Sequence, residues 1–162
     1  MIRDAATEDL GTIVSIYNAA IPGRLATADT EPVSVASRQE WFRQHIPGKH
    51  PLWVIQRDQR IAGWLSFSPF YGRPAYAATA EVSVYVAPEV HREGLARQLL
   101  EQAISRARGL GIETLLGFIF AHNEPSLQLF ERFEFRRWGH LPRVARLDGV
   151  ERDLVIVGRR LG

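Results

Sequence analysis

The chain contains no cysteine, and this absence limits the chemistry available to it. A disulfide framework, a thiol nucleophile and a thiolate metal site are all excluded. A bound metal would need histidine or carboxylate ligands, and the five histidines include no pair at helical i, i+4 spacing. We therefore expect no metal site.

Long hydrophobic runs and an excess of charge of one sign are also missing. No stretch approaches the ~20 apolar residues of a membrane span. The start of the chain, Met1–Ala5, has no basic leader followed by an apolar run. The net charge is only +2, and the arginines are interspersed with acidic residues. We expect a cytoplasmic protein that binds neither membrane nor nucleic acid.

Linkers, low-complexity segments and repeats are absent as well. The 162 residues are 46% hydrophobic, which is enough to build one core of strands and helices. The sequence therefore predicts a single domain over residues 1–162.

Hydrophobic spacing predicts short elements in the first half of the chain. A strand over residues 2–5 precedes a helix that Thr7 caps, and the capping box that begins at Ser37 predicts the start of a second helix. Residues 52–56 and 61–67 flank a polar turn, as in an antiparallel hairpin.

The second half continues this mixture of strands and helices. Residues 113–121 are almost continuously apolar, as in a central strand, and Asn123 is a suitable N-cap for the helix that follows. A loop over residues 146–149 leads to a last strand over residues 154–157. This order predicts a mixed α/β fold, with a largely antiparallel sheet and one parallel step.

The most informative segment is a strand over residues 79–86 that leads into a short basic turn. Val82, Val84 and Val86 alternate with polar positions, and the turn His91-Arg92-Glu93-Gly94-Leu95-Ala96 opens directly into a helix. Unpaired backbone N–H groups at a helix start favour an anion, most simply a phosphate. The spacing fits neither a Walker loop nor a dinucleotide-binding turn. An ordinary strand-to-helix connection is the alternative interpretation.

The turn is a variant of the Arg/Gln-x-x-Gly-x-Gly/Ala motif of the GNAT N-acetyltransferases. Further segments of the chain resemble that superfamily, and within it the phosphinothricin and methionine sulfoximine acetyltransferases; they are residues 2–10, 27–32, 79–86 and 123–130. The resemblance implies an α/β (α+β) GNAT fold: a mixed, mostly antiparallel sheet of about seven strands with about four helices. It also implies a parallel pair of strands that splays apart, and a homodimer.

In this resemblance the co-substrate is acetyl-CoA. The backbone of Val84, Tyr85 and Val86 is expected to pair with its pantetheine arm, along which Asn123 and Ser126 also lie. Phe130 is expected near the thioester. The pyrophosphate is expected at the turn formed by His91, Arg92, Glu93, Gly94, Leu95, Ala96 and Arg97.

Glu81 matches the position of the family's general base. A base is needed because an α-amine is mostly protonated at neutral pH, and only the neutral amine can attack the thioester directly. The alternative is a carboxylate that faces solvent or pairs with an arginine. Arg73 and Tyr76 stand where the family contacts a small amino-acid-like amine, and Tyr71 and Gly72, in the same loop, are expected to bind it with them.

Other functions remain open at this point: acetylation of a protein N-terminus or a polyamine, or acyl-CoA binding without catalysis. The chain also departs from the family pattern at four positions, one of which is Arg92, where the family often has glycine. His91 replaces an arginine or glutamine, and Phe130 stands where many members have a tyrosine that protonates the departing thiolate. Glu134 replaces a helix-ending glycine, at an expected cost of about 1 kcal/mol if the backbone stays left-handed.

Overall fold

Seven strands form one sheet in the order β1-β2-β3-β4-β5-β7-β6. The computed structural model describes all 162 residues. The strands are β1 (Ile2–Asp4), β2 (Leu52–Arg57), β3 (Arg60–Pro69), β4 (Thr79–Val86), β5 (Thr114–Phe120), β6 (Arg136–Leu147) and β7 (Val150–Arg160). All neighbouring pairs are antiparallel except β4 and β5. The predicted mixed, mostly antiparallel sheet is confirmed.

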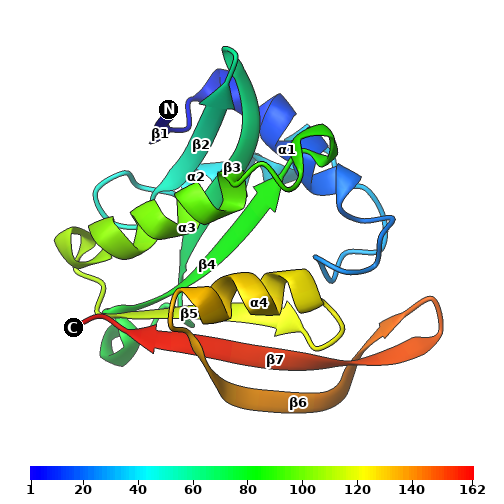
Figure 1. Cartoon of the computed structure of the whole chain (residues 1–162). Helices are drawn as coiled ribbons and strands as arrows, with labels where there is room; N and C mark the ends of the chain where they lie inside the picture. The colour runs from blue at the N-terminus through cyan, green and yellow to red at the C-terminus, as the bar shows by residue number, and fades with distance from the viewer.

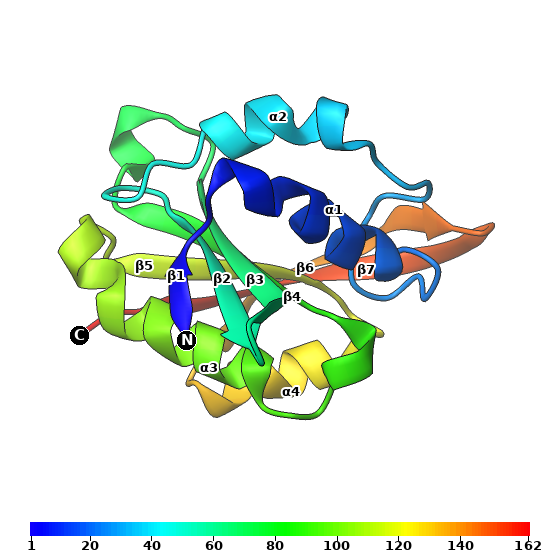
Figure 2. The same ribbon diagram turned by 90° about the horizontal axis from the view of Figure 1, so that it is seen from above.

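Four α-helices cover the sheet, two on each side (Figures 1 and 2). They are α1 (Leu10–Ala19), α2 (Val35–Arg43), α3 (Leu95–Arg106) and α4 (Glu124–Arg132). A core of 21 buried residues lies mainly between the sheet and α3 and α4, and a smaller core of six lies on the α1 side. None of the helices has the length and hydrophobicity needed to cross a membrane.

The parallel strands β4 and β5 pair only at their beginnings. The register ends where Glu81 pairs with Leu116, although β4 continues to Val86 and β5 to Phe120. The two strands therefore splay apart, as predicted. Ala87 N–H donates to Ala62 on the β3 side at 2.8 Å, so strand alternation turns the backbone of Val84 and Val86 toward the gap.

The starts of the first two helices differ from the predictions. Residues Thr7–Asp9 form a 3₁₀ turn before α1, and Asp9 rather than Thr7 accepts a backbone hydrogen bond there, from Ala6 N–H at 2.7 Å. Helix α2 begins at Val35, because the Ser34 hydroxyl accepts the N–H of Ser37 at 3.1 Å and so caps the helix three residues earlier than expected.

The predicted last strand is present but longer than predicted, and the predicted loop before it is shorter. Residues 146–147 end the long edge strand β6, and β7 begins at Val150 and so is longer than predicted. Only Asp148 and Gly149, both with positive φ, form the turn between them. Most β6 side chains are exposed, and Pro142 lies within the strand, so the segment shows neither hydrophobic alternation nor a continuous apolar run.

Candidate active site

The gap between the splayed strands is a cavity of about 430 Å³. Its walls are formed by β4, β5, the first turns of α4 and a loop over residues 25–28, with side chains of the β6–β7 hairpin at its rim. Predicted site residues that line it are Glu81, Val84, Tyr85, Asn123, Ser126 and Phe130. These residues come from segments up to 49 positions apart in sequence, and the fold brings them together.

A turn rich in free backbone donors follows β4 and begins α3. Gly94 is the N-cap of α3 with φ +83°, and no backbone hydrogen bond has its donor N–H in residues 92–97. A Cβ built on Gly94 would meet nothing within 4 Å. Glycine is therefore favoured here by the left-handed backbone and not by a crowded neighbour. The arrangement supplies the unpaired amides that a phosphate group requires.

Side chains around this turn fix its position. His91 Nε2 lies 2.9 Å from the carbonyl oxygen of Val86 and so ties the turn to the end of β4. Glu93 forms an ion pair with Arg57 of β2. Leu95 is buried, Ala96 is partly buried and Arg92 is exposed. The His91 side chain thus fixes the turn by its contact with the backbone carbonyl of Val86.

Helix α4 is placed by its cap and by a glycine beneath it. The Asn123 side chain accepts the N–H of Ser126 at 3.2 Å, which confirms the predicted cap, and donates to the carbonyl of Leu25 at 3.2 Å. Phe130 packs so tightly over β5 that a Cβ on Gly117 would lie 3.0 Å from its ring. Phe130 has no proton to give, and the same wall of the cavity offers no tyrosine or histidine in its place.

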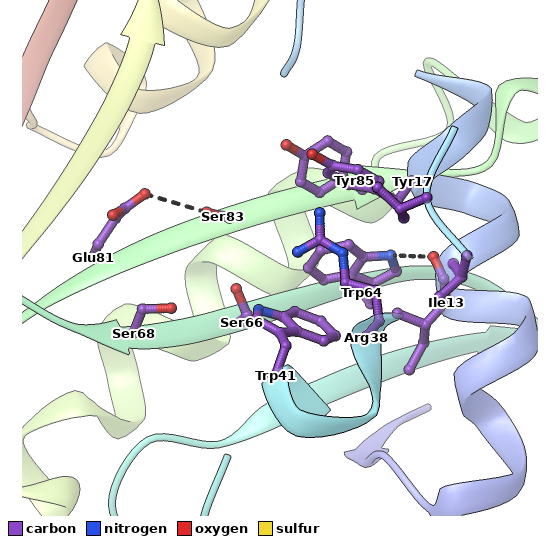
Figure 3. A pocket seen from close by; sticks show the side chains of 12 residues that line it. Ile13, Tyr17, Arg38, Trp41, Trp64, Ser66, Ser68, Glu81, Ser83 and Tyr85 are labelled. Carbon is purple, nitrogen blue, oxygen red and sulfur yellow. Dashed lines mark hydrogen bonds between the residues drawn. The ribbon is translucent and has the colours of Figure 1, made fainter. Parts of the chain in front are cut away.

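A second cavity of about 240 Å³ lies between strands β3 and β4 and the helices α1 and α2 that cover them (Figure 3). Twelve residues line it: Ile13, Val14, Tyr17, Val33, Arg38, Trp41, Trp64, Ser66, Ser68, Glu81, Ser83 and Tyr85. Three of them, Glu81, Ser83 and Tyr85, also line the first cavity. The polar face of β4 therefore borders both spaces.

Glu81 is the only carboxylate that lines either cavity. Burial raises the pKa of its carboxyl group, and the Ser83 hydroxyl, 3.5 Å away, opposes this shift. Glu81 has no arginine partner among the ion pairs of the chain. A half-buried, unpaired carboxylate between two cavities is well suited to accept a proton.

Burial also raises the pKa of the Tyr85 hydroxyl, so this group stays neutral at physiological pH. The hydroxyl donates to the carbonyl oxygen of Ala26 at 3.1 Å. It thereby holds the loop over residues 25–28 against β4.

Arg38 of α2 is the only cationic side chain that lines either cavity. Its guanidinium lies 4.9 Å from the ring centre of Tyr17 and 5.8 Å from that of Trp41. One of its nitrogens is 3.0 Å from an Asp29 carboxylate oxygen, and Tyr17 donates to the same carboxylate. The aromatic rings and Asp29 together fix the position of this charge.

The loop residues predicted to bind substrate lie elsewhere. Tyr71, Gly72, Arg73 and Tyr76 line neither cavity, and Tyr71 is 78% exposed. Phe70, Tyr71 and Tyr76 instead form a small aromatic cluster on an exposed loop. The predicted substrate contacts therefore do not line the cavities that Glu81 borders.

Histidines and late arginines are also outside both cavities. His122 Nε2 lies 2.8 Å from the carbonyl oxygen of Arg24, and His140 lies 2.7 Å from Asp153. Arg143 and Arg146 belong to strand β6, so Arg146 lies in a strand and not in the predicted loop.

Sequence reasoning missed the second cavity, including Arg38. One signal was available: the stretch Trp64-Leu65-Ser66-Phe67-Ser68 puts a tryptophan and two serines on one face of an otherwise apolar strand. Small hydroxyl side chains at alternate positions of a buried strand indicate a polar space above them.

A splayed parallel pair of strands, a turn of free amides and a carboxylate where the strands diverge match the arrangement that the sequence predicts for an acetyltransferase. The model of the "Acetyltransferase (GNAT) family" matches residues 13–135. The chain belongs to this family and is an acetyltransferase enzyme.

Two relatives with named activities are similar to this chain over almost its whole length. Over 161 residues the chain is 47% identical to the Bacillus subtilis (strain 168) protein named "Putative phosphinothricin acetyltransferase YwnH", which covers 99% of this chain and 98% of the relative. It is 32% identical over 157 residues to an L-methionine sulfoximine/L-methionine sulfone acetyltransferase of Pseudomonas paraeruginosa, covering 96% of this chain and 91% of the relative.

A solved structure of a GNAT superfamily enzyme has the same fold as this chain. The crystal structure of a GNAT superfamily phosphinothricin acetyltransferase from Sinorhizobium meliloti, in complex with acetyl-CoA, matches with a TM-score of 0.93 and 26% identity. The match covers 100% of this chain and 88% of that one. The predicted GNAT fold is confirmed.

Proposed function

We propose that the protein transfers an acetyl group from acetyl-CoA to the primary amine of a small amino-acid-like molecule, such as phosphinothricin or methionine sulfoximine. The observation that carries this proposal is the position of Glu81, whose carboxylate lines both cavities where β4 and β5 part. One cavity suits the acyl donor and the other suits a small acceptor. The named activities of the relatives support the same acceptor class.

The residues around the larger cavity fit acetyl-CoA. The N–H groups of residues 92–97 are free to bind its pyrophosphate, with Arg92 and Arg97 adding positive charge. The unpaired backbone of Val84 and Val86 is available to its pantetheine arm, beside Asn123 and Ser126. When bound, acetyl-CoA supplies the activated acyl group.

The chain's own groups then provide the proton transfer. Glu81 accepts a proton from the acceptor's ammonium group, so that the neutral amine can attack. The N–H groups of Val84 and Val86 face the gap and can donate to an oxygen on which negative charge builds. Because Phe130 cannot protonate the leaving thiolate, that proton comes from water or from the protonated Glu81.

Three alternatives are less well supported by the site. A polyamine acceptor calls for several carboxylates, whereas Glu81 is the only one and Arg38 adds a positive charge. A protein N-terminus calls for an open groove, and the acceptor cavity has a volume of only about 240 Å³. Acyl-CoA binding without catalysis leaves the buried, unpaired carboxylate without a role.

The decisive experiment measures release of coenzyme A with L-phosphinothricin, L-methionine sulfoximine, spermidine and an N-terminal peptide as acceptors. We expect turnover with the first two, and a fall of about 100-fold or more in kcat for Glu81→Gln with unchanged acetyl-CoA affinity. Glu101→Gln, an exposed change on α3, is the matched control. Turnover of only the peptide or spermidine contradicts the proposed acceptor, and full activity of Glu81→Gln contradicts the assigned base.

We also propose that the chain is one domain over residues 1–162 and acts in the cytoplasm as a homodimer. The dimer matters for the site, since the loop from Tyr71 to Tyr76 lines neither cavity of its own chain and would bind substrate at the cavity of the second subunit.

A further inference from the structure

The acceptor cavity has a negative end and a positive end. Its floor is formed by facing residues of β3 and β4, which pair as Ser68 with Glu81, Ser66 with Ser83, and Trp64 with Tyr85. Glu81 lies at the first of these pairs. Figure 3 shows Arg38 near the third, among the aromatic rings, with Glu81 at the far side of the view.

The length of the floor limits how a small molecule can use both ends. Glu81 and Tyr85 are four residues apart on one strand, which corresponds to about 13 Å between their Cα atoms. An α-amine and its own α-carboxylate are only about two bonds apart, which is much shorter than the floor between its two ends. A group several bonds from the amine can reach Arg38.

The middle of the cavity favours hydrogen bonding. Ser66 is 3% exposed, and no side-chain hydrogen bond within the chain uses its hydroxyl. The only fully buried side-chain polar atom without a hydrogen-bond partner is His122 Nδ1, so the Ser66 hydroxyl oxygen is not fully buried. The hydroxyl therefore faces the cavity, where it can bind a polar group between the two charged ends.

The guanidinium of Arg38 is held in place but is not fully used. Only one of its nitrogens bonds Asp29, so further N–H donors remain for a ligand. A guanidinium fork with two free donors matches the paired oxygens of a phosphinate, sulfonyl or carboxylate group.

We propose that Arg38 determines acceptor specificity by binding an anionic or strongly polar oxygen group at the end of the acceptor remote from the reacting amine. This inference rests on the proposed function, because it assumes that the amine lies at Glu81. In this proposal Arg38 does not bind the α-carboxylate of the amino acid. Acceptors with a distal phosphinate, sulfoximine or ω-carboxylate are therefore preferred.

Three acceptors that differ by one group test the proposal. L-phosphinothricin carries the amine, the α-carboxylate and the distal phosphinate. L-2-aminobutyrate lacks the phosphinate, and 3-aminopropyl(methyl)phosphinate lacks the α-carboxylate. For each, kcat/KM is measured with the wild-type protein, Arg38→Gln, Arg38→Lys and the control Arg43→Gln. Arg43 is exposed on the same helix and pairs only with Glu40.

We expect Arg38→Gln to lower kcat/KM about 30-fold for both phosphinates, and so to lower the preference for phosphinothricin over 2-aminobutyrate by a similar factor. Arg38→Lys restores part of this preference because it keeps the charge but not the fork. Arg43→Gln behaves as the wild type. An equal loss on all three acceptors, or none, overturns the assignment.

Calorimetry separates this inference from the proposed function. Binding of L-phosphinothricin is measured with coenzyme A present, using wild type and Arg38→Gln. If wild type binds the compound and Arg38→Gln does not, the role of Arg38 stands even where no acetyl transfer occurs, and only the proposed function fails. If the two bind equally, or wild type does not bind, the role of Arg38 is wrong.

Discussion

Glu81 has a cost in stability that follows from its role. Its pKa is raised above the ordinary 4.5 by burial, so the folded state binds a proton more readily than the unfolded state does. The stability that the folded state gains by binding this proton is complete below pH 4.5. It is lost as the pH rises through the pKa of the folded state. At neutral pH the carboxylate therefore destabilises the fold.

Two measurements follow for this residue. The acid limb of the pH profile of kcat/KM is expected at a pH above 4.5, since the base must be ionised to work. Glu81→Gln is expected to raise the melting temperature at pH 7.5 while it removes activity. Glu101→Gln serves as control and changes neither. A lower melting temperature for Glu81→Gln contradicts the assigned direction of the pKa shift.

Some individual site residues could be located from the sequence, and others could not. Glu81, Gly94 and Asn123 could be placed from the sequence because each lies next to a strong local signal: an alternating strand, a glycine turn or a helix cap. Arg38 gave no such signal, because its position depends on the packing of α2 against β3 and on Asp29. Contacts between distant segments of this kind are fixed by tertiary structure, not by local pattern.

Among the elements, the turn before α3 allows binding and stability to be separated. Gly94 and Gly111 both have positive φ, +83° and +80°, and a Cβ at either would meet nothing within 4 Å. Alanine at either position should destabilise the protein by about 1 kcal/mol. Only Gly94→Ala is expected to weaken acetyl-CoA binding, by about 10-fold, because alanine disfavours the left-handed backbone at this turn and so displaces the free amides around it. Equal binding by the two variants argues against a phosphate site at this turn.

Helix α4 ends at a strained position. Glu134 has φ +65°, so the left-handed conformation that usually favours glycine is kept. Its contact with Arg159, at 3.7 Å and with the Glu134 side chain 76% exposed, contributes little. Glu134→Gly is expected to raise the free energy of unfolding by up to about 1 kcal/mol in urea. Glu131→Gly, inside the same helix, should lower it by about as much.

The elements that could not be predicted share a physical cause. Strand β6 is an exposed edge strand, so no buried face imposes alternation on its sequence. The pair Asp148-Gly149 was the available signal, because an Asp-Gly dipeptide between two strands is typical of a two-residue hairpin turn. The start of α2 was misplaced because Ser34 and Ser37 are both acceptable caps, and only the backbone of residue 34 decides between them.

For the whole molecule, the proposed homodimer is tested by mass. Sedimentation equilibrium is expected to give about twice the chain mass of 18.3 kDa at the concentrations used for activity. The loop that carries Arg73 lines neither of the two cavities of its own chain, and in the proposed dimer it would act on the site of the second subunit. A single-chain mass under assay conditions, with full activity, removes that role from Arg73.

The gap in the sheet also predicts where solvent exchange should change. After Glu81 the edge of β4 that faces β5 has no neighbouring strand, so the amide hydrogens of Val84 and Val86 are open to water. An extended ligand arm lying there would complete the hydrogen-bond ladder as an extra strand does. Deuterium uptake at these two amides should therefore slow when acetyl-CoA is added. The amides of Ser83 and Tyr85, already bonded toward β3, should be unaffected.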